Sequence, residues 1–159
     1  MLARSLILTF TTAFALVCWP VVAADIVLTI DGKTQGEKAF DFSLADLEAM
    51  PSASVTTDTP WYDNAVTFTG VRLADLMAVV GARGETAYVV ALNDYAVEVP
   101  IADFEAFGVI LALKADGVYM PVDDKGPLFV IYPFDANPKL NSEEYFMRAV
   151  WQVRTITIE

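Results

Sequence analysis

The sequence predicts an α+β fold, a domain with a mixed β-sheet and a few short helices. Short runs of β-branched and aromatic residues outnumber the helical patterns, and turn residues separate most of them. The most apolar run beyond the N-terminal segment is 128–132, five consecutive apolar or aromatic residues between Gly126-Pro127 and Pro133. Such a run predicts a strand that is buried on both faces. Helices are expected to cover at least one face of the sheet.

The strands are predicted from alternating or continuous apolar runs that end at Gly, Pro, Asn or Asp. Asp31-Gly32 and Asp116-Gly117 are turn signals, and Gly70 is expected to end the strand before it. Asn93-Asp94 predicts a hairpin turn, although Tyr95 follows where glycine is usual. The predicted strands are 25–31, 39–42, 53–58, 65–69, 86–92, 95–99, 109–114, 118–121, 128–132 and 151–158.

Four short helices are predicted between these strands. Ser43 is expected to cap the first, with Asp46 as the acid of a capping box. The second has apolar residues spaced for one face and ends at Gly81. Ser142 is expected to cap the last. The predicted helices are 43–48, 71–80, 101–107 and 142–149, and 135–141 is expected to be a polar loop.

The N-terminal segment has the pattern of an export signal. Arg4 precedes the apolar stretch 6–17, which is too short to span a bilayer, and small residues for cleavage follow at 21–24. We therefore expect a signal peptide at 1–24 and a single domain at 25–159. Cys18 is not expected to be a lipid anchor, because Val17 stands where a small residue is needed. The expected location is periplasmic or secreted, with no membrane insertion after cleavage.

Composition excludes several kinds of chemistry. Beyond the signal segment the chain has no histidine and no cysteine. It therefore lacks the groups for a disulfide, a thiol nucleophile, histidine acid–base work, an ordinary zinc site or a His-ligated haem. All 21 acidic residues lie in 25–159, against nine basic ones once Arg4 is removed, which leaves a net charge of −12. Such a charge disfavours nucleic acid and anionic lipid as partners, and favours a cationic one.

Five segments in order suggest a known family. They are 68–76 (FTGVRLADL), 91–100 (ALNDYAVEVP), 116–121 (DGVYMP), 126–133 (GPLFVIYP) and 151–156 (WQVRTI). With these segments the chain resembles the oxidoreductase molybdopterin-binding domain of the sulfite-oxidase type, over most of 53–158. Its closest resemblance is to short exported relatives that consist of this domain alone. The resemblance implies the sulfite-oxidase-like fold and a cleft.

The chain departs from this family at the residue that ligates the metal. In the enzymes a cysteine at the end of the strand before the first of these segments ligates molybdenum, and the corresponding stretch here, 55–61, contains no sulfur. Basic residues that could hold the pterin phosphate are Lys125, Arg148 and Arg154, whereas Arg72 and Arg83 are expected on helix surfaces. We therefore expect a binding module without catalysis and without a cofactor, for a small molecule or a periplasmic partner protein. The alternative is a molybdopterin-binding oxidoreductase, or a subunit of one.

The candidate cleft is expected where loops follow the strands. Its aromatic residues offer flat apolar faces with polar tips, which suit a ring-shaped or cationic ligand. The competing interpretation is that Trp61 and Trp151 only pack and that Lys125 is a solvated turn residue. Trp61 is predicted either to fill the space of the missing cofactor or to form a ligand-facing wall. The three predicted walls are Thr57, Asp58, Trp61 and Tyr62; Asn93, Asp94 and Tyr95; and Lys125, Arg148 and Trp151.

Two further sites are less well supported by the sequence. Asp135, Asn137 and Glu143 or Glu144 offer hard oxygen ligands for calcium, but the loop lacks the glycine and the spacing of a calcium loop. The adjacent pair at 123–124 is poorly placed for acid–base work, because neighbouring residues on an extended chain point to opposite faces. No metal site is therefore predicted.

Overall fold

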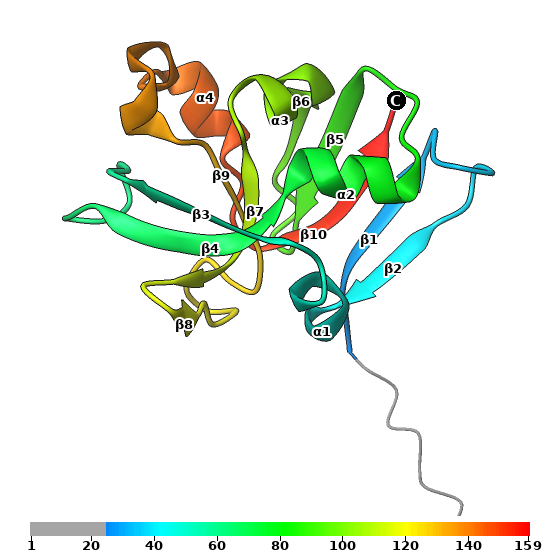
Figure 1. The fold of residues 1–159 in the computed structure, drawn as a ribbon, viewed down its shortest axis with the longest axis horizontal. Helices are drawn as coiled ribbons and strands as arrows, with labels where there is room; N and C mark the ends of the chain where they lie inside the picture. The colour runs from blue at the N-terminus through cyan, green and yellow to red at the C-terminus, as the bar shows by residue number, and fades with distance from the viewer. Residues whose placement is uncertain (1–24) are drawn as a thin grey trace, which may run out of the picture.

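The computed structural model describes residues 25–159 (Figure 1). The predicted signal peptide at 1–24 lies outside the described residues. The predicted fold class is confirmed: residues 25–159 form ten strands, with four short α-helices set between them. The strands divide between two sheets.

The first sheet is mixed. Its strand order is β2-β1-β10-β5-β6, and β1 pairs with β10 in parallel while the other neighbours are antiparallel. The first and last described strands, β1 and β10, therefore lie side by side within this sheet (Figure 1). The five strands are β1 (Ile26–Gly32), β2 (Phe40–Ser43), β5 (Thr86–Ala91), β6 (Ala96–Pro100) and β10 (Val153–Ile158).

The second sheet is antiparallel, in the order β3-β4-β7-β8, with β9 also paired to β7. The backbone of β9 joins the two sheets: the Val130 amide donates to the Val150 carbonyl at 2.9 Å, and the Val153 amide donates to the Leu128 carbonyl at 3.0 Å. These contacts bring the segment that enters β10 beside β9. The strands are β3 (Ser52–Thr57), β4 (Val66–Arg72), β7 (Ile110–Ala115), β8 (Val118–Tyr119) and β9 (Phe129–Ile131).

The ends of the helices agree with the predicted caps, with two differences. Ser43 and Asp46 form the predicted capping box, and Gly81 ends its helix with a left-handed backbone. The second helix begins at Leu73 and not at residue 71, because 71–72 are still paired with β7. Ser142 occupies the predicted N-cap position of the last helix, but its side chain makes no capping bond. The helices are α1 (Leu44–Glu48), α2 (Leu73–Val80), α3 (Ile101–Ala106) and α4 (Glu143–Arg148), and the predicted polar loop holds two 3-10 turns, η1 (Phe134–Ala136) and η2 (Pro138–Leu140).

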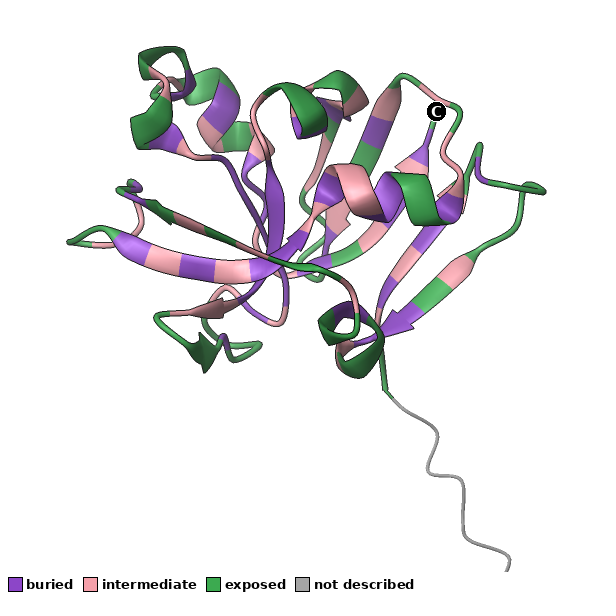
Figure 2. Cartoon of the chain, in the orientation of Figure 1, coloured by how far each residue is buried: buried purple, intermediate pink, exposed green. Residues whose placement is uncertain are grey.

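The core lies where the two sheets and α2 meet, as the buried residues in Figure 2 show. All three residues of β9 are fully buried, as are Leu128 and Tyr132 on either side of it. This confirms the prediction of a strand that is buried on both faces. No helix among residues 25–159 is long and apolar enough to cross a membrane.

Gly70 does not end its strand, contrary to the prediction. It lies inside β4, where a register shift next to Thr69 brings the Leu111 carbonyl of β7 close to it. A Cβ atom at this position would lie 2.0 Å from that carbonyl oxygen. The missing side chain therefore permits close approach of the neighbouring strand, and does not interrupt the pairing.

We expect Gly70→Ala to lower the free energy of unfolding by about 3 kcal/mol, because the added methyl forces the central β4 and β7 strands apart. Urea denaturation measures the loss. Gly36→Ala is the control: nothing lies within 4 Å of its Cβ position and its φ is 75°, so only backbone strain is added. That control should cost about 1 kcal/mol. Equal losses in the two variants would contradict the steric explanation.

Candidate functional site

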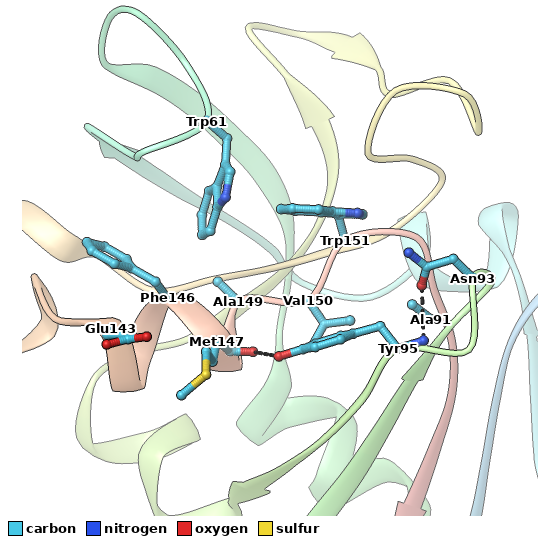
Figure 3. A pocket seen from close by; sticks show the side chains of 10 residues that line it. All are labelled: Trp61, Ala91, Asn93, Tyr95, Glu143, Phe146, Met147, Ala149, Val150 and Trp151. Carbon is cyan, nitrogen blue, oxygen red and sulfur yellow. Dashed lines mark hydrogen bonds between the residues drawn. The ribbon is translucent and has the colours of Figure 1, made fainter.

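A pocket of about 320 Å³ lies between the loop after β3, the β5–β6 turn, helix α4 and the segment that leads into β10 (Figure 3). Four residues of the predicted cleft meet here, from all three predicted walls. The lining is largely apolar and aromatic, with a single carboxylate. The lining residues are Trp61, Ala91, Asn93, Tyr95, Glu143, Phe146, Met147, Ala149, Val150 and Trp151.

Trp61 both packs and lines the pocket. Its ring lies 5.5 Å from that of Phe129 and 5.6 Å from that of Trp151, measured between centroids. Phe134 and Phe146 lie against it at 6.2 and 6.1 Å. The two interpretations of Trp61 from the sequence therefore apply together: the aromatic cluster holds the ring, and the held ring forms part of the pocket wall (Figure 3).

Two hydrogen bonds position the opposite wall. The Tyr95 hydroxyl donates to the Met147 carbonyl at 2.9 Å, which ties the β5–β6 turn to α4 (Figure 3). The Tyr95 amide donates to Asn93 Oδ1 at 3.1 Å. Asp94 takes the left-handed backbone conformation in this turn, with a φ of 63°. Aspartate tolerates that conformation better than most residues, which explains a tight turn without glycine.

Thr57 and Asp58 do not line the pocket. The Thr57 side chain is fully buried, and its hydroxyl donates to the Asp58 carbonyl and accepts from the Asp135 amide, both at 3.2 Å. The Asp58 amide donates to Asp135 Oδ2 at 2.8 Å. These bonds fix the start of the Trp61 loop against η1. Their role is to position the loop.

Lys125, Tyr62 and Asp94 also lie outside the pocket lining. Lys125 Nζ is 2.8 Å from Asp124 Oδ1 and 4.6 Å from the centroid of the Tyr62 ring. Burial raises the pKa of the Tyr62 hydroxyl. Asp94 is exposed and lies 3.5 Å from the guanidinium of Arg154. The structure therefore places Lys125 and Arg154, two of the three predicted phosphate-binding cations, in other contacts.

Arg148, the third predicted cation, belongs to a polar network on the other side of α4. Its guanidinium donates to Asp103 Oδ2 at 2.9 Å and to Glu144 Oε1 at 2.6 Å, and it lies 5.1 Å from the centroid of the Tyr145 ring. The buried Tyr132 hydroxyl donates to the same Asp103 oxygen at 3.0 Å. Arg148 therefore anchors α4 to α3 and, through Asp103, to Tyr132 just after β9, and it does not line the pocket.

This network predicts how stability depends on alkaline pH. Burial raises the pKa of Tyr132, and the neighbouring Asp103 carboxylate raises it further. A tyrosine whose pKa is raised in the folded state stabilises the fold below its unfolded pKa, about 10, and that contribution is lost as the pH rises above it. We expect urea unfolding to show falling stability above about pH 10. Tyr132→Phe should flatten this slope; an unchanged slope would contradict the assignment.

Three of the four candidate calcium ligands are engaged by groups of the protein. Asp135 Oδ2 accepts from the Asp58 amide, Asn137 Oδ1 accepts from the Lys139 amide at 3.0 Å, and Glu144 binds Arg148. Within the described chain no three His, Cys, Asp or Glu side chains gather as metal ligands. The Asp123-Asp124 pair is exposed, and Asp124 is paired with Lys125.

Sequence reasoning missed the wall that α4 provides. Phe146 and Met147 were not singled out, and Glu143 was considered only as a candidate calcium ligand. One signal was available: Glu143 and Met147 are four residues apart and therefore share one face of a helix. Ala91, Ala149 and Val150 carry no chemical signal, and only the fold brings them to the pocket.

A comparison with protein families shows to which family this chain belongs. The family model described as oxidoreductase molybdopterin binding domain matches residues 17–136. The chain belongs to this family. The matched range begins before the 53–158 of the sequence resemblance and ends before α4, so the pocket wall formed by Glu143–Trp151 lies outside it.

A solved structure supports the same fold. The crystal structure of the sulfane dehydrogenase SoxCD from Paracoccus pantotrophus is similar, with a TM-score of 0.62 and 21% sequence identity. The similarity covers 82% of this chain and 37% of that chain, so this chain spans well under half of its length. No curated protein matches the sequence.

The pocket residues do not fit molybdopterin. None of the ten lining residues is Lys or Arg, so nothing there neutralises a phosphate, and Glu143 adds a negative charge. No cysteine is present in 25–159 to ligate molybdenum. At the end of β3, Thr57 is buried and its hydroxyl is already engaged with the backbone. The chain therefore has the fold of the family, but the residues that line this pocket do not suit the family's cofactor.

Proposed function

We propose that this chain is a non-catalytic binding module that has the molybdopterin-binding fold and takes a small molecule or a partner protein without a cofactor. The observation that carries the proposal is the chemistry of the pocket. Its walls are largely aromatic and apolar, and they include no cation for a phosphate and no cysteine thiolate for a metal. A mostly apolar concave site with a few polar groups is the usual form of a small-molecule site.

The N-terminal pattern supports export to the periplasm or beyond the cell. The net charge of residues 25–159 supports a partner that is neither nucleic acid nor an anionic membrane surface. A partner in that compartment would reach the pocket from its open side, where Met147 is about half exposed (51%).

Family membership favours a second candidate, a molybdopterin-binding oxidoreductase or a subunit of one with a ligand supplied by another chain. In that case the pterin phosphate would need cations from outside the pocket lining. Lys125→Ala and Arg148→Ala should then lower the pterin content of the purified protein, because phosphate is held by such groups. Under the binding-module proposal neither variant changes the pterin content, which is zero.

The absorbance spectrum of protein purified from its own cells tests the proposal. We expect only the aromatic band of tryptophan and tyrosine. The denatured and oxidised sample should show no pterin fluorescence. A pterin signal that scales with protein concentration and falls in both variants would overturn the proposal and support the second candidate.

A further inference from the structure

The pocket at Trp61 and Trp151 combines aromatic walls with one carboxylate and no cation. Trp61, Tyr95, Phe146 and Trp151 supply the rings, and Glu143 supplies the carboxylate (Figure 3). Aromatic faces attract cations through the ring quadrupole, and several rings around one site bind alkylated ammonium groups. From this chemistry we infer that the pocket binds a small quaternary ammonium cation. This inference rests on the proposed function, because it assigns the ligand class of the same site.

The aromatic rings of the pocket have no lysine or arginine side chain over them, unlike several other rings among the described residues. Lysine or arginine cations lie over five rings elsewhere, between 4.3 and 5.8 Å from the centroids: Phe40, Tyr62, Phe107, Tyr119 and Tyr145. Within residues 25–159, none lies over Trp61, Tyr95, Phe146 or Trp151. The aromatic rings that line the pocket are therefore available to a cation that binds from outside the protein.

The carboxylate of Glu143 is also free to act on a ligand. Its neighbour Glu144 binds Arg148 at 2.6 Å, but in the part of the chain described here the carboxylate of Glu143 forms no hydrogen bond or ion pair. Glu143 lies one helical turn before Met147, on the face of α4 that lines the pocket. The acidic surface of residues 25–159 adds to the attraction of a cation and repels an anion.

The walls are held in place before a ligand arrives. Trp61 and Trp151 meet edge to face, with 82° between their planes, and Trp61 packs on three further rings. The hydrogen bond from the Tyr95 hydroxyl to the Met147 carbonyl fixes the opposite ring. A preorganised site loses less entropy on binding, so a small ligand can be retained by few contacts.

Three probes of the same shape test the charge preference. Choline is the cation, 3,3-dimethyl-1-butanol is its neutral isostere, and 3,3-dimethylbutanoate is the anion. Each is titrated into ¹⁵N-labelled protein while the indole N–H signals of Trp61 and Trp151 are followed. We expect choline to shift both signals and to bind about tenfold more tightly than the alcohol, and the carboxylate to shift neither. An alcohol that binds as tightly as choline, a carboxylate that binds more tightly, or no shift with millimolar choline would overturn the inference.

Matched variants assign the effect to the pocket. Trp151→Ala should abolish choline binding, and Glu143→Gln should weaken it about threefold, as expected for an exposed charge. Glu85→Gln is the control; it removes an exposed carboxylate at the opposite end of β5 from Ala91 and should leave binding unchanged. Equal losses of choline affinity in Glu143→Gln and Glu85→Gln would contradict the assignment of choline binding to this pocket.

The pterin absorbance of the same sample separates this inference from the proposed function. If the sample contains no pterin, a failed choline test overturns only this inference. A pterin band overturns the proposed function, and this inference with it.

Discussion

Replacing Trp61 with alanine should lower the free energy of unfolding by about 3–5 kcal/mol, because it leaves a cavity where the ring now packs on four others. Phe129 and Trp151 lie closest, at 5.5 and 5.6 Å between centroids. The same change removes one wall of the pocket, so choline binding should be lost at temperatures at which the variant is still folded. Urea denaturation and the choline titration measure the two effects.

Two further variants sharpen this test. Trp61→Phe keeps an aromatic ring and should lose about 1 kcal/mol. Tyr88→Ala removes a ring that is 37% exposed on β5, and it should change stability by less than about 1 kcal/mol. If Trp61→Ala melts like the wild type and keeps all binding, Trp61 is an idle surface residue and the pocket is wrongly placed.

The second large effect is expected at Arg148. Its side chain is 17% exposed and that of its partner Asp103 is 13% exposed, so the ion pair is largely shielded from water. Arg148→Met keeps the apolar stem but leaves the Asp103 carboxylate with only the Tyr132 hydroxyl as a donor. Removal of one partner of a buried pair costs about 3–5 kcal/mol. Chemical denaturation measures the loss.

The matched control is Arg72→Met. Arg72 pairs with Glu105 at 3.4 Å, but the two side chains are 40% and 78% exposed. A surface pair of this kind contributes at most about 1 kcal/mol. Similar losses in the two variants would show that Arg148 contributes no more than a surface charge, and would contradict its assignment as the anchor of α4.

The elements of the fold could be predicted from the sequence because their signals are local. The capping box of Ser43 and Asp46, the helix end at Gly81 and the buried run at β9 depend on residues near one another in the chain. Gly70 was misread because its role is set by the Leu111 carbonyl of β7, some forty residues away. The division into two sheets depends on the same kind of distant pairing.

The candidate site was predicted in part for a related reason. Trp61, Asn93, Tyr95 and Trp151 carry distinctive side chains next to predicted turns, and the structure brings them to one pocket. Lys125 and Arg148 were included for their charge, because a sequence does not show that Asp124 and Asp103 already neutralise them. Asp103 lies 45 residues before Arg148, so that pairing depends on the fold. Asp124 is the neighbour of Lys125, and there the sequence lacked only the side-chain geometry.

Molybdenum analysis of protein purified from its own cells tests the central claim most directly. The claim is that the chain keeps the fold of the molybdopterin-binding family around a pocket that does not hold the cofactor. We expect protein quantified by amino-acid analysis to contain no stoichiometric molybdenum. One molybdenum per chain in the native protein would contradict the claim.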